Sequence, residues 1–227
     1  MESYEFPIFG DDGFRSKFGE GFMSKKSISI FSKGIGRYLC IKKNFLPVII
    51  GRDTRESGKI IENIIVSTLS SYGINVVLAD IIPTPGLSKL LSLGNYACGI
   101  MITASHNPAS DNGIKLFNSS GIKLEVHEEK LIEREIRNID ASDPKFKIGE
   151  VIKLENPCSL YINSFIKNYK INCDQKILID CSNGAMSDIA YQLFNGHKNF
   201  ILINNNPNGK NINLNCGALE TKQLLKE

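Results

Sequence analysis

No segment of the 227-residue sequence is apolar over the roughly 20 residues that a membrane-spanning helix needs, because the longest apolar runs are short stretches at 47–51 and 81–83. The N-terminal residues carry acidic groups and lack the apolar core of a signal peptide. An excess of one charge is also missing, since 27 Lys and Arg residues oppose 24 Asp and Glu residues. We therefore expect a cytoplasmic protein with no membrane and no nucleic acid among its partners.

Several common functional motifs are absent as well. The cysteines form no C-x2-C pair, which disfavours a zinc site or a redox dithiol and leaves them as reduced packing residues; they lie at 40, 98, 158, 173, 181 and 216. Six residues separate Gly51 from Gly58, so that loop is not a P-loop, and no G-x-G-x-x-G follows a predicted strand. Without a G-x-S-x-G elbow, the neighbours Ser105 and His106 do not indicate a hydrolase triad.

What the sequence does contain is the pattern of an α/β protein, with 42% hydrophobic and 22% charged residues. Strands are predicted at 47–50, 75–79, 97–103 and 114–117. Helices are predicted at 24–43, from an N-cap at Ser57 to Gly73, at 87–93 and at 127–139. Beyond a polar stretch the pattern restarts, with a helix at 160–169, a strand at 176–180, a helix at 188–194 and a strand at 200–203. This alternation predicts a mixed, mostly parallel sheet flanked by helices.

The polar stretch 140–157 contains two prolines and marks a domain boundary. We expect a complete first domain at 1–145, a linker at 146–157 and an incomplete second domain of similar topology at 158–227. About 70 residues are few for a closed layered domain, so its apolar residues, such as Ile177, Ile179 and Phe194, are expected to be poorly covered.

The segment 97–117 reads as two strands joined by a long polar loop, and loops of that length in compact domains are often functional. Asn112-Gly113 is a typical turn dipeptide. One interpretation is a plain polar turn. The other places Ser105 at an exposed loop tip as a nucleophile or phosphate carrier, with Lys115 returning toward it to neutralise charge or move a proton and His106 as an electrostatic neighbour.

The charged loop at 51–59 follows a buried strand, a usual position for an active-site rim in an open α/β sheet. Arg52 could bind phosphate there, because the guanidinium is a planar fork of donors. A structural ion pair between Arg52 and Asp53 is an equally good interpretation. The other two histidines, His127 and His197, are expected to face solvent.

Four motifs together resemble the α-D-phosphohexomutases, and within that family the bacterial phosphoglucosamine mutases. They are G-D-D-G-F-R at 10–15, G-R-D-T-R at 51–55, P-T-P-G at 83–86 and, most specifically, G-I-M-I-T-A-S-H-N-P at 99–108. Further similarity lies in D-N-G-I-K-L-F at 111–117, D-C-S-N-G-A at 180–185, P-N-G-K-N-I-N at 207–213 and C-G-A at 216–218. The resemblance spans essentially the whole chain.

The resemblance implies an intramolecular phosphotransferase that interconverts glucosamine 6-phosphate and glucosamine 1-phosphate through a phosphoserine at Ser105 and a sugar bisphosphate. Arg15 and Lys115 match family positions that stabilise charge and handle protons, with His106 beside the serine. Arg15, Arg52, Asn107 and Lys115 are the implied phosphate-binding residues. A phosphoserine oxygen at Ser105 is implied as a ligand of one Mg²⁺, a hexose 1,6-bisphosphate as activator, and a homodimer for the full-length family member.

The family has four domains, and this sequence contains no D-G-D-G-D-R loop, whose three aspartates complete the metal site. We therefore expect an N-terminal fragment or a truncated gene product that is inactive alone. A phosphomannomutase or phosphoglucomutase is the alternative activity. A non-catalytic binding or assembly module from a truncated gene is the alternative of another class.

Overall fold

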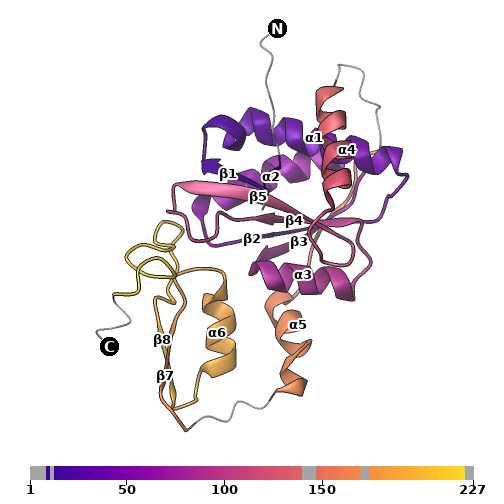
Figure 1. Cartoon of the computed structure of the whole chain (residues 1–227). Helices are drawn as coiled ribbons and strands as arrows, with labels where there is room; N and C mark the ends of the chain where they lie inside the picture. Colours follow the sequence, from indigo (N-terminus) through magenta and orange to yellow (C-terminus); the bar gives the residue numbers. More distant parts are fainter. Residues whose placement is uncertain (1–8, 11–12, 140–146, 170–173, 223–227) are drawn as a thin grey trace.

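A six-stranded sheet forms the centre of the larger unit of the chain (Figure 1). The computed structural model describes residues 9–10, 13–139, 147–169 and 174–222. The strand order is β1-β5-β4-β2-β3-β6, and the strands are β1 (Phe14–Lys17), β2 (Val48–Arg52), β3 (Val76–Ile81), β4 (Cys98–Ile102), β5 (Asp111–Asn118) and β6 (Val151–Lys153). Only β5 is antiparallel to its neighbours β4 and β1, which confirms the predicted mixed, mostly parallel sheet.

Helices cover both faces of this sheet (Figure 1). One face packs against α1 (Lys25–Ile41), α2 (Glu56–Ser71) and α4 (Val126–Arg137), and α3 (Thr84–Leu93) covers the other. Strand alternation explains the two cores, because Val48 and Ile50 of β2 join the first and Ile49 joins the second. A short 3-10 turn, η1 (Gly21–Met23), leads into α1.

Two glycines that weaken the prediction of α1 from sequence have a packing role. A Cβ atom at Gly34 would lie 2.2 Å from Ile136 Cγ1 of α4, and one at Gly36 would lie 2.8 Å from the ring of Tyr72. The missing side chains therefore let α1 approach its neighbours closely, and tertiary packing overrides the low helix propensity of glycine.

The second unit is small and lies below α3 in Figure 1. It contains α5 (Pro157–Asn163), a 3-10 turn η2 (Ile166–Asn168), β7 (Ile177–Asp180), α6 (Met186–Phe194) and β8 (Phe200–Ile203), with β7 and β8 forming a parallel two-stranded sheet. The helix predicted at 160–169 is thus shorter and begins earlier. Pro157 occupies the first turn, and near the other end Ser164 Oγ donates 2.6 Å to the Tyr161 carbonyl oxygen.

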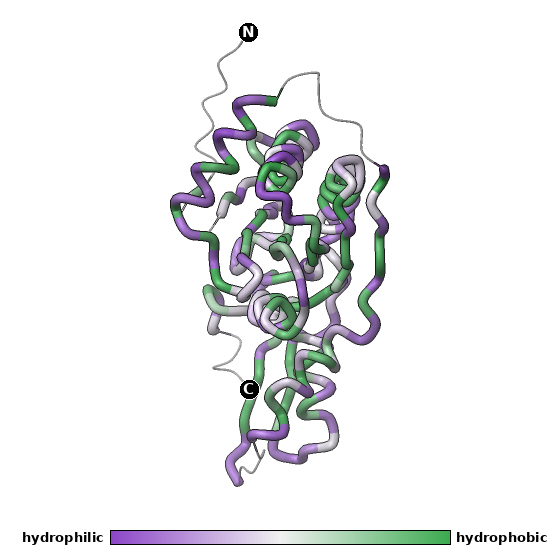
Figure 2. Tube along the Cα trace, turned by 90° about the vertical axis from the view of Figure 1, so that its right-hand side faces the viewer, coloured by the Kyte–Doolittle hydropathy of each residue, from purple (hydrophilic) through white to green (hydrophobic). Residues whose placement is uncertain are grey.

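The second unit leaves apolar side chains open to solvent. Ile177, Ile179 and Phe194 are only half-buried, and Tyr191 and Ile201 are exposed. In Figure 2 the apolar segments of the larger unit run mostly through its middle, and the second unit forms the narrower lower part of the molecule. This arrangement agrees with the expected incomplete second domain.

Three sequence-based expectations need correction. Asn112-Gly113 forms no turn but lies inside β5, where Asn112 is fully buried and its Nδ2 donates 2.9 Å to Ser57 Oγ. Ser57 is therefore not the N-cap of α2; Arg55 holds that position and Ser57 sits in the first turn. The stretch expected to be a linker supplies β6, which pairs with β3 at the sheet edge. The expected boundary at 145/146 lies outside the described residues.

The five cysteines within the described segments are free thiols, and Cys173 lies outside them. His127 and His197 are exposed, as predicted. Over the same segments, no helix combines the length and apolar character needed to cross a membrane.

Candidate active site

Ser105 lies at the tip of the loop between β4 and β5, here called the serine loop (residues 103–110). Its side chain is exposed and its backbone has a φ of 56°, in the left-handed region that non-glycine residues rarely adopt. The Ser105 N–H donates 3.0 Å to Thr103 Oγ1, and the Asn107 N–H donates 3.1 Å to the Ala104 carbonyl oxygen. These local bonds fold the loop back on itself and present the Ser105 hydroxyl to solvent.

A buried arginine, Arg55, holds the serine loop through its backbone carbonyls. Arg55 is 1% exposed, and its Nη2 donates 3.0 Å to the Ser105 carbonyl oxygen and 2.9 Å to that of Asn107. Nη1 donates to the Pro108 carbonyl oxygen. One planar guanidinium thus binds three carbonyls of the loop, which a lysine ammonium could not do with the same geometry.

Asp53 balances the charge of Arg55. Its Oδ2 accepts from Arg55 Nε at 2.9 Å and from Thr103 Oγ1 at 2.7 Å, and its Oδ1 accepts from the Arg55 N–H at 3.0 Å. Asp53 and Thr103 are both buried. The carboxylate therefore couples the loop after β2 to the first residue of the serine loop, and a buried ion pair with satisfied hydrogen bonds results.

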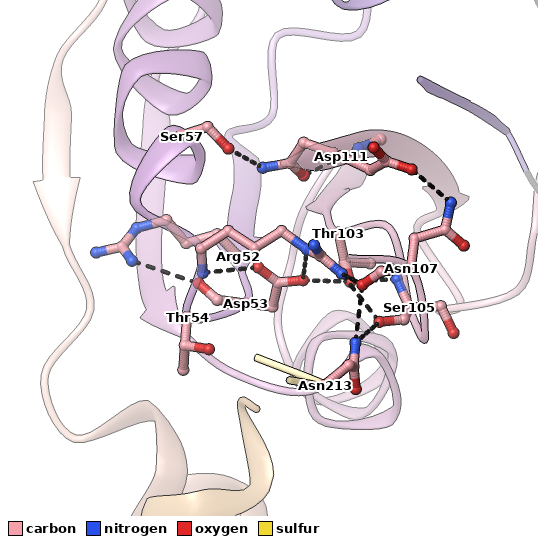
Figure 3. A network of polar contacts seen from close by, with 12 residues as sticks. Arg52, Asp53, Thr54, Ser57, Thr103, Ser105, Asn107, Asp111 and Asn213 are labelled. Atoms are coloured by element: carbon pink, nitrogen blue, oxygen red, sulfur yellow. Dashed lines mark hydrogen bonds and ion pairs between the residues drawn. The ribbon is translucent and has the colours of Figure 1, made fainter. Parts of the chain in front are cut away.

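The structure does not bring Arg52 to Ser105. Its guanidinium points away from the serine loop in Figure 3, contacts Asp80 through Nη2, and lies 3.4 Å from Glu62 Oε2 through Nε. The alternative interpretation, an ion pair between Arg52 and Asp53, is wrong, because the Asp53 carboxylate pairs with Arg55. Side chains of successive residues diverge where β2 ends, so Arg52 turns toward α2 and β3.

Three other predicted site residues, Arg15, His106 and Asn107, lie on the serine loop or next to it. Arg15 of β1 is opposite Gly113, whose carbonyl oxygen accepts from the Thr103 N–H at 3.0 Å, so Arg15 lies near the base of the serine loop. His106 is exposed beside Ser105. Asn107 Nδ2 donates 2.9 Å to Asp111 Oδ2.

Lys115 is half-buried on β5 and lines a cavity of about 180 Å³ whose lining does not include Ser105. The other residues around this cavity include Thr84, Phe117, Lys123 and Glu129. Lys115 and Ser105 therefore do not line this cavity together.

Comparisons with known proteins fit this geometry. The family described as phosphoglucomutase/phosphomannomutase, alpha/beta/alpha domain I, matches residues 7–143. The chain belongs to this family. A phosphoglucosamine mutase of Helicobacter pylori (strain G27) is 38% identical over 97% of the chain and 51% of its own length, and one of Solibacter usitatus is 36% identical over 96% and 49%. The chain thus spans about half the length of these curated relatives.

Solved structures of the family share the fold. One is a Thermus thermophilus protein whose structure is named "putative phosphomannomutase". It superposes with a TM-score of 0.76 at 23% identity, covering 90% of this chain and 47% of that one. A phosphoglucomutase/phosphomannomutase family protein from Burkholderia thailandensis gives a TM-score of 0.69 at 20% identity, covering 87% and 43%. At these identities the likeness shows the architecture alone.

For a member of this family, the metal ligands are of direct interest. Within 9–10, 13–139, 147–169 and 174–222, no group of three or more His, Cys, Asp and Glu side chains is placed to hold a metal ion. The described residues by themselves therefore do not provide a complete set of protein ligands for Mg²⁺.

Sequence reasoning missed the residues that hold the serine loop. Arg55, Asp53 and Thr103 lie within the family-like motifs, but only their three-dimensional contacts give them a role. The second unit also reaches this site, because Asn213 Nδ2 donates 2.9 Å to the Ser105 carbonyl oxygen (Figure 3). The signal in the sequence was the Arg-Asp-Thr-Arg run, in which a carboxylate stands two residues before an arginine.

Proposed function

We propose that this chain is the phosphate-carrying part of a mutase that interconverts glucosamine 6-phosphate and glucosamine 1-phosphate. The observation that carries the proposal is Ser105, an exposed hydroxyl at a left-handed loop position that a buried ion pair holds in place. The 38% identity to a phosphoglucosamine mutase over nearly the whole chain favours a hexosamine phosphate as substrate.

In the proposed reaction Ser105 carries a phosphoryl group in the resting state. A sugar hydroxyl attacks phosphorus, the bond from phosphorus to Ser105 Oγ breaks, and a bond to the sugar oxygen forms. The hydroxyl proton passes to a base and Oγ leaves with its electron pair. The sugar bisphosphate reorients and returns its other phosphate to Ser105 by the reverse step, so phosphate and charge balance over the cycle.

Cations near the loop are assigned to charge stabilisation. A phosphoserine carries about −1.5 to −2 charge at pH 7, which nearby cations must offset. Arg15 lies at the base of the serine loop and Lys115 on the adjacent strand β5, and both could approach the phosphate when substrate is bound. His106 neighbours the serine and is assigned an electrostatic role. Arg52 is left out of this set because two acidic side chains bind its guanidinium.

Mg²⁺ and a hexose 1,6-bisphosphate activator are proposed for the complete protein. Phosphohexomutases generally depend on Mg²⁺, which when bound would offset negative charge on phosphate oxygens. We propose two domains as the sequence suggested, except that β6 belongs to the first because it pairs with β3. We also propose the cytoplasm as location and a homodimer as the assembly of the full-length protein. The chain alone is expected to lack mutase turnover, since it corresponds to about half of its relatives.

The proposal is tested on two proteins. The 227-residue chain and the longest protein encoded by the same open frame are incubated with glucosamine 1,6-bisphosphate and Mg²⁺, and then assayed with glucosamine, glucose and mannose 6-phosphates. We expect turnover in the longer protein, fastest with the glucosamine ester, and none in the chain. Faster turnover of mannose or glucose 6-phosphate would assign that sugar phosphate as the substrate instead. A longer protein that never acquires phosphate on Ser105 would contradict the proposed phosphate carrier.

A further inference from the structure

Two carbonyl oxygens of the serine loop are each bound from two sides. Arg55 Nη2 reaches the carbonyls of Ser105 and Asn107 from inside the larger unit, at 3.0 and 2.9 Å. Asn213 Nδ2 reaches the same two oxygens from the second unit, at 2.9 and 3.0 Å (Figure 3). A carbonyl oxygen has two lone pairs, so both donors can bind at once. The loop that carries Ser105 is therefore clamped between the two units.

Asn213 is itself held rigidly. Its φ is 58°, a left-handed value that asparagine tolerates better than most residues, and its N–H donates 2.9 Å to the Ser182 carbonyl oxygen. The preceding residue, Ile212, is buried. Because both backbone and neighbour are fixed, the position of the Asn213 amide reports where the second unit sits.

Other contacts dock the second unit without touching the serine. Thr54 Oγ1 donates 2.6 Å to the Asn183 carbonyl oxygen, and the Glu56 N–H donates 3.0 Å to the Gly209 carbonyl oxygen. The first donor lies on the loop after β2, and the second is the first residue of α2. Docking of the unit and contact with the serine loop are thus made by separate groups, and the two can be separated by mutation.

We propose that Asn213 is a positioning residue that couples the docking of the second unit to the geometry of Ser105. The Ser105 carbonyl belongs to the same stretch of backbone in which Ser105 has a φ of 56°. With Asn213 in place, two donors fix that carbonyl and so restrict the backbone that carries the Ser105 side chain. When the second unit moves away, only Arg55 remains and the serine backbone gains freedom. The role in phosphoryl transfer rests on the proposed function, whereas the clamp itself does not.

The clamp is tested by amide hydrogen exchange, followed by NMR, on the 227-residue chain and its Asn213→Gly variant. Glycine tolerates the left-handed backbone and removes only the amide side chain. We expect exchange of the Ser105 and Asn107 amides to accelerate roughly tenfold, as for the loss of two hydrogen bonds to one loop. The matched control is Asn215→Gly, since Asn215 is exposed and also has a positive φ of 54°. It should leave both amides unchanged.

The Glu56 amide separates local positioning from loss of docking, because its partner is Gly209 of the second unit. We expect its exchange to stay unchanged in Asn213→Gly. Unchanged exchange at Ser105 and Asn107, or an equal acceleration at Glu56, overturns the positioning role. Asn213→Asp provides a second variant, because a carboxylate keeps the size but has no N–H for the two carbonyls. It should accelerate exchange at Ser105 and Asn107 at least as much.

A chemical readout extends the test to function. The longest protein encoded by the same open frame is phosphorylated with glucose 1,6-bisphosphate and Mg²⁺, and the loss of phosphate from Ser105 is followed by mass spectrometry. Asn213→Gly should change the half-life of the phosphate at least threefold while Asn215→Gly does not. If the longer protein without substitutions takes up no phosphate, the proposed function fails, and the exchange result on the 227-residue chain still decides the role of Asn213. An equal half-life in both variants, with phosphate present, contradicts the coupling to chemistry.

Discussion

Arg55 Nη2 lies 3.0 Å from the carbonyl oxygen of Ser105, so a buried guanidinium fixes the backbone of the proposed phosphoserine. The same guanidinium pairs with Asp53 at 2.9 Å. Stability and site geometry therefore depend on one ion pair. We therefore expect a substitution of Arg55 to lower the stability of the fold, whereas a substitution of Ser105 should remove activity.

Replacing Arg55 should destabilise the fold strongly. Arg55→Met leaves Asp53 buried without its counter-charge and removes one donor from each of three loop carbonyls, and removal of one partner of a buried pair costs about 3–5 kcal/mol. Urea unfolding followed by circular dichroism measures the loss. The matched control is Arg137→Met, because Arg137 is 67% exposed and pairs with Glu133 at 4.0 Å. That variant should change stability by no more than about 0.5 kcal/mol. Similar losses in both variants would contradict the structural role of Arg55.

The serine that carries phosphate should be identifiable directly. Ser105→Ala in the full-length protein should abolish nearly all mutase turnover, because the loop position held by Arg55 would then lack its hydroxyl. Phosphopeptide mass spectrometry should find phosphate on Ser105 of the parent protein. Ser110→Ala is the matched control, since Ser110 is an exposed serine of the same loop, and it should keep both turnover and phosphate. Phosphate found reproducibly on another serine, with Ser105 bare, would refute the assignment.

Much of the larger unit could be predicted because its signals are local. The alternation of Val48, Ile49 and Ile50 and the spacing of apolar residues in α2 depend only on near neighbours in the sequence. Asn112-Gly113 shows where local rules fail. That dipeptide favours a turn in isolation, but the hydrogen bond from Asn112 to Ser57, which lies 55 residues away, places it in a buried strand.

The site was predicted only in part, for a related reason. Ser105 could be predicted because its motif lies within a polar loop that is recognisable between two predicted strands. The sequence points to Arg52 as a phosphate ligand, but Arg55 stands in the same motif, and only the course of the chain after β2 decides that Arg55 faces the serine loop and Arg52 faces α2. The contact from Asn213 joins residues 108 positions apart, and no pattern along the chain encodes it.

Lys115 should matter through the transition state more than through folding. It is half-buried at the rim of a cavity, and a lost acid–base or charge-stabilising group typically lowers turnover by roughly 10²–10⁴-fold. Lys115→Met in the full-length protein is expected to show that loss with little change in melting temperature. Lys123→Met is the control, because Lys123 lines the same cavity. Normal turnover in the folded fraction of Lys115→Met would make Lys115 a structural residue.

The fold should lose stability in alkali through a buried thiol. Burial, reinforced by the Glu128 carboxylate, raises the pKa of Cys98 from 9.0 to about 12, and burial also raises the pKa of the neighbouring Tyr38 from 10.0 to about 12. Each group therefore stays protonated in the folded state at a pH where the unfolded chain ionises. The stability that Cys98 provides is present below pH 9 and is lost as the pH rises toward 12.

Urea unfolding of the chain at about pH 9.5 and about pH 10.5 measures this loss. Between these two pH values the free energy of unfolding should fall less when the Cys98 thiol is removed. The difference should be about 1 kcal/mol, close to the change that one titrating proton causes per pH unit. Cys98→Ala and Cys98→Ser serve as paired variants, because both abolish the titration but only serine places a hydroxyl in the apolar site. Their stabilities at neutral pH should differ, whereas their alkaline slopes should agree and be shallower than that of the parent chain. Slopes equal to the parent in both variants would show that the thiol does not titrate with unfolding.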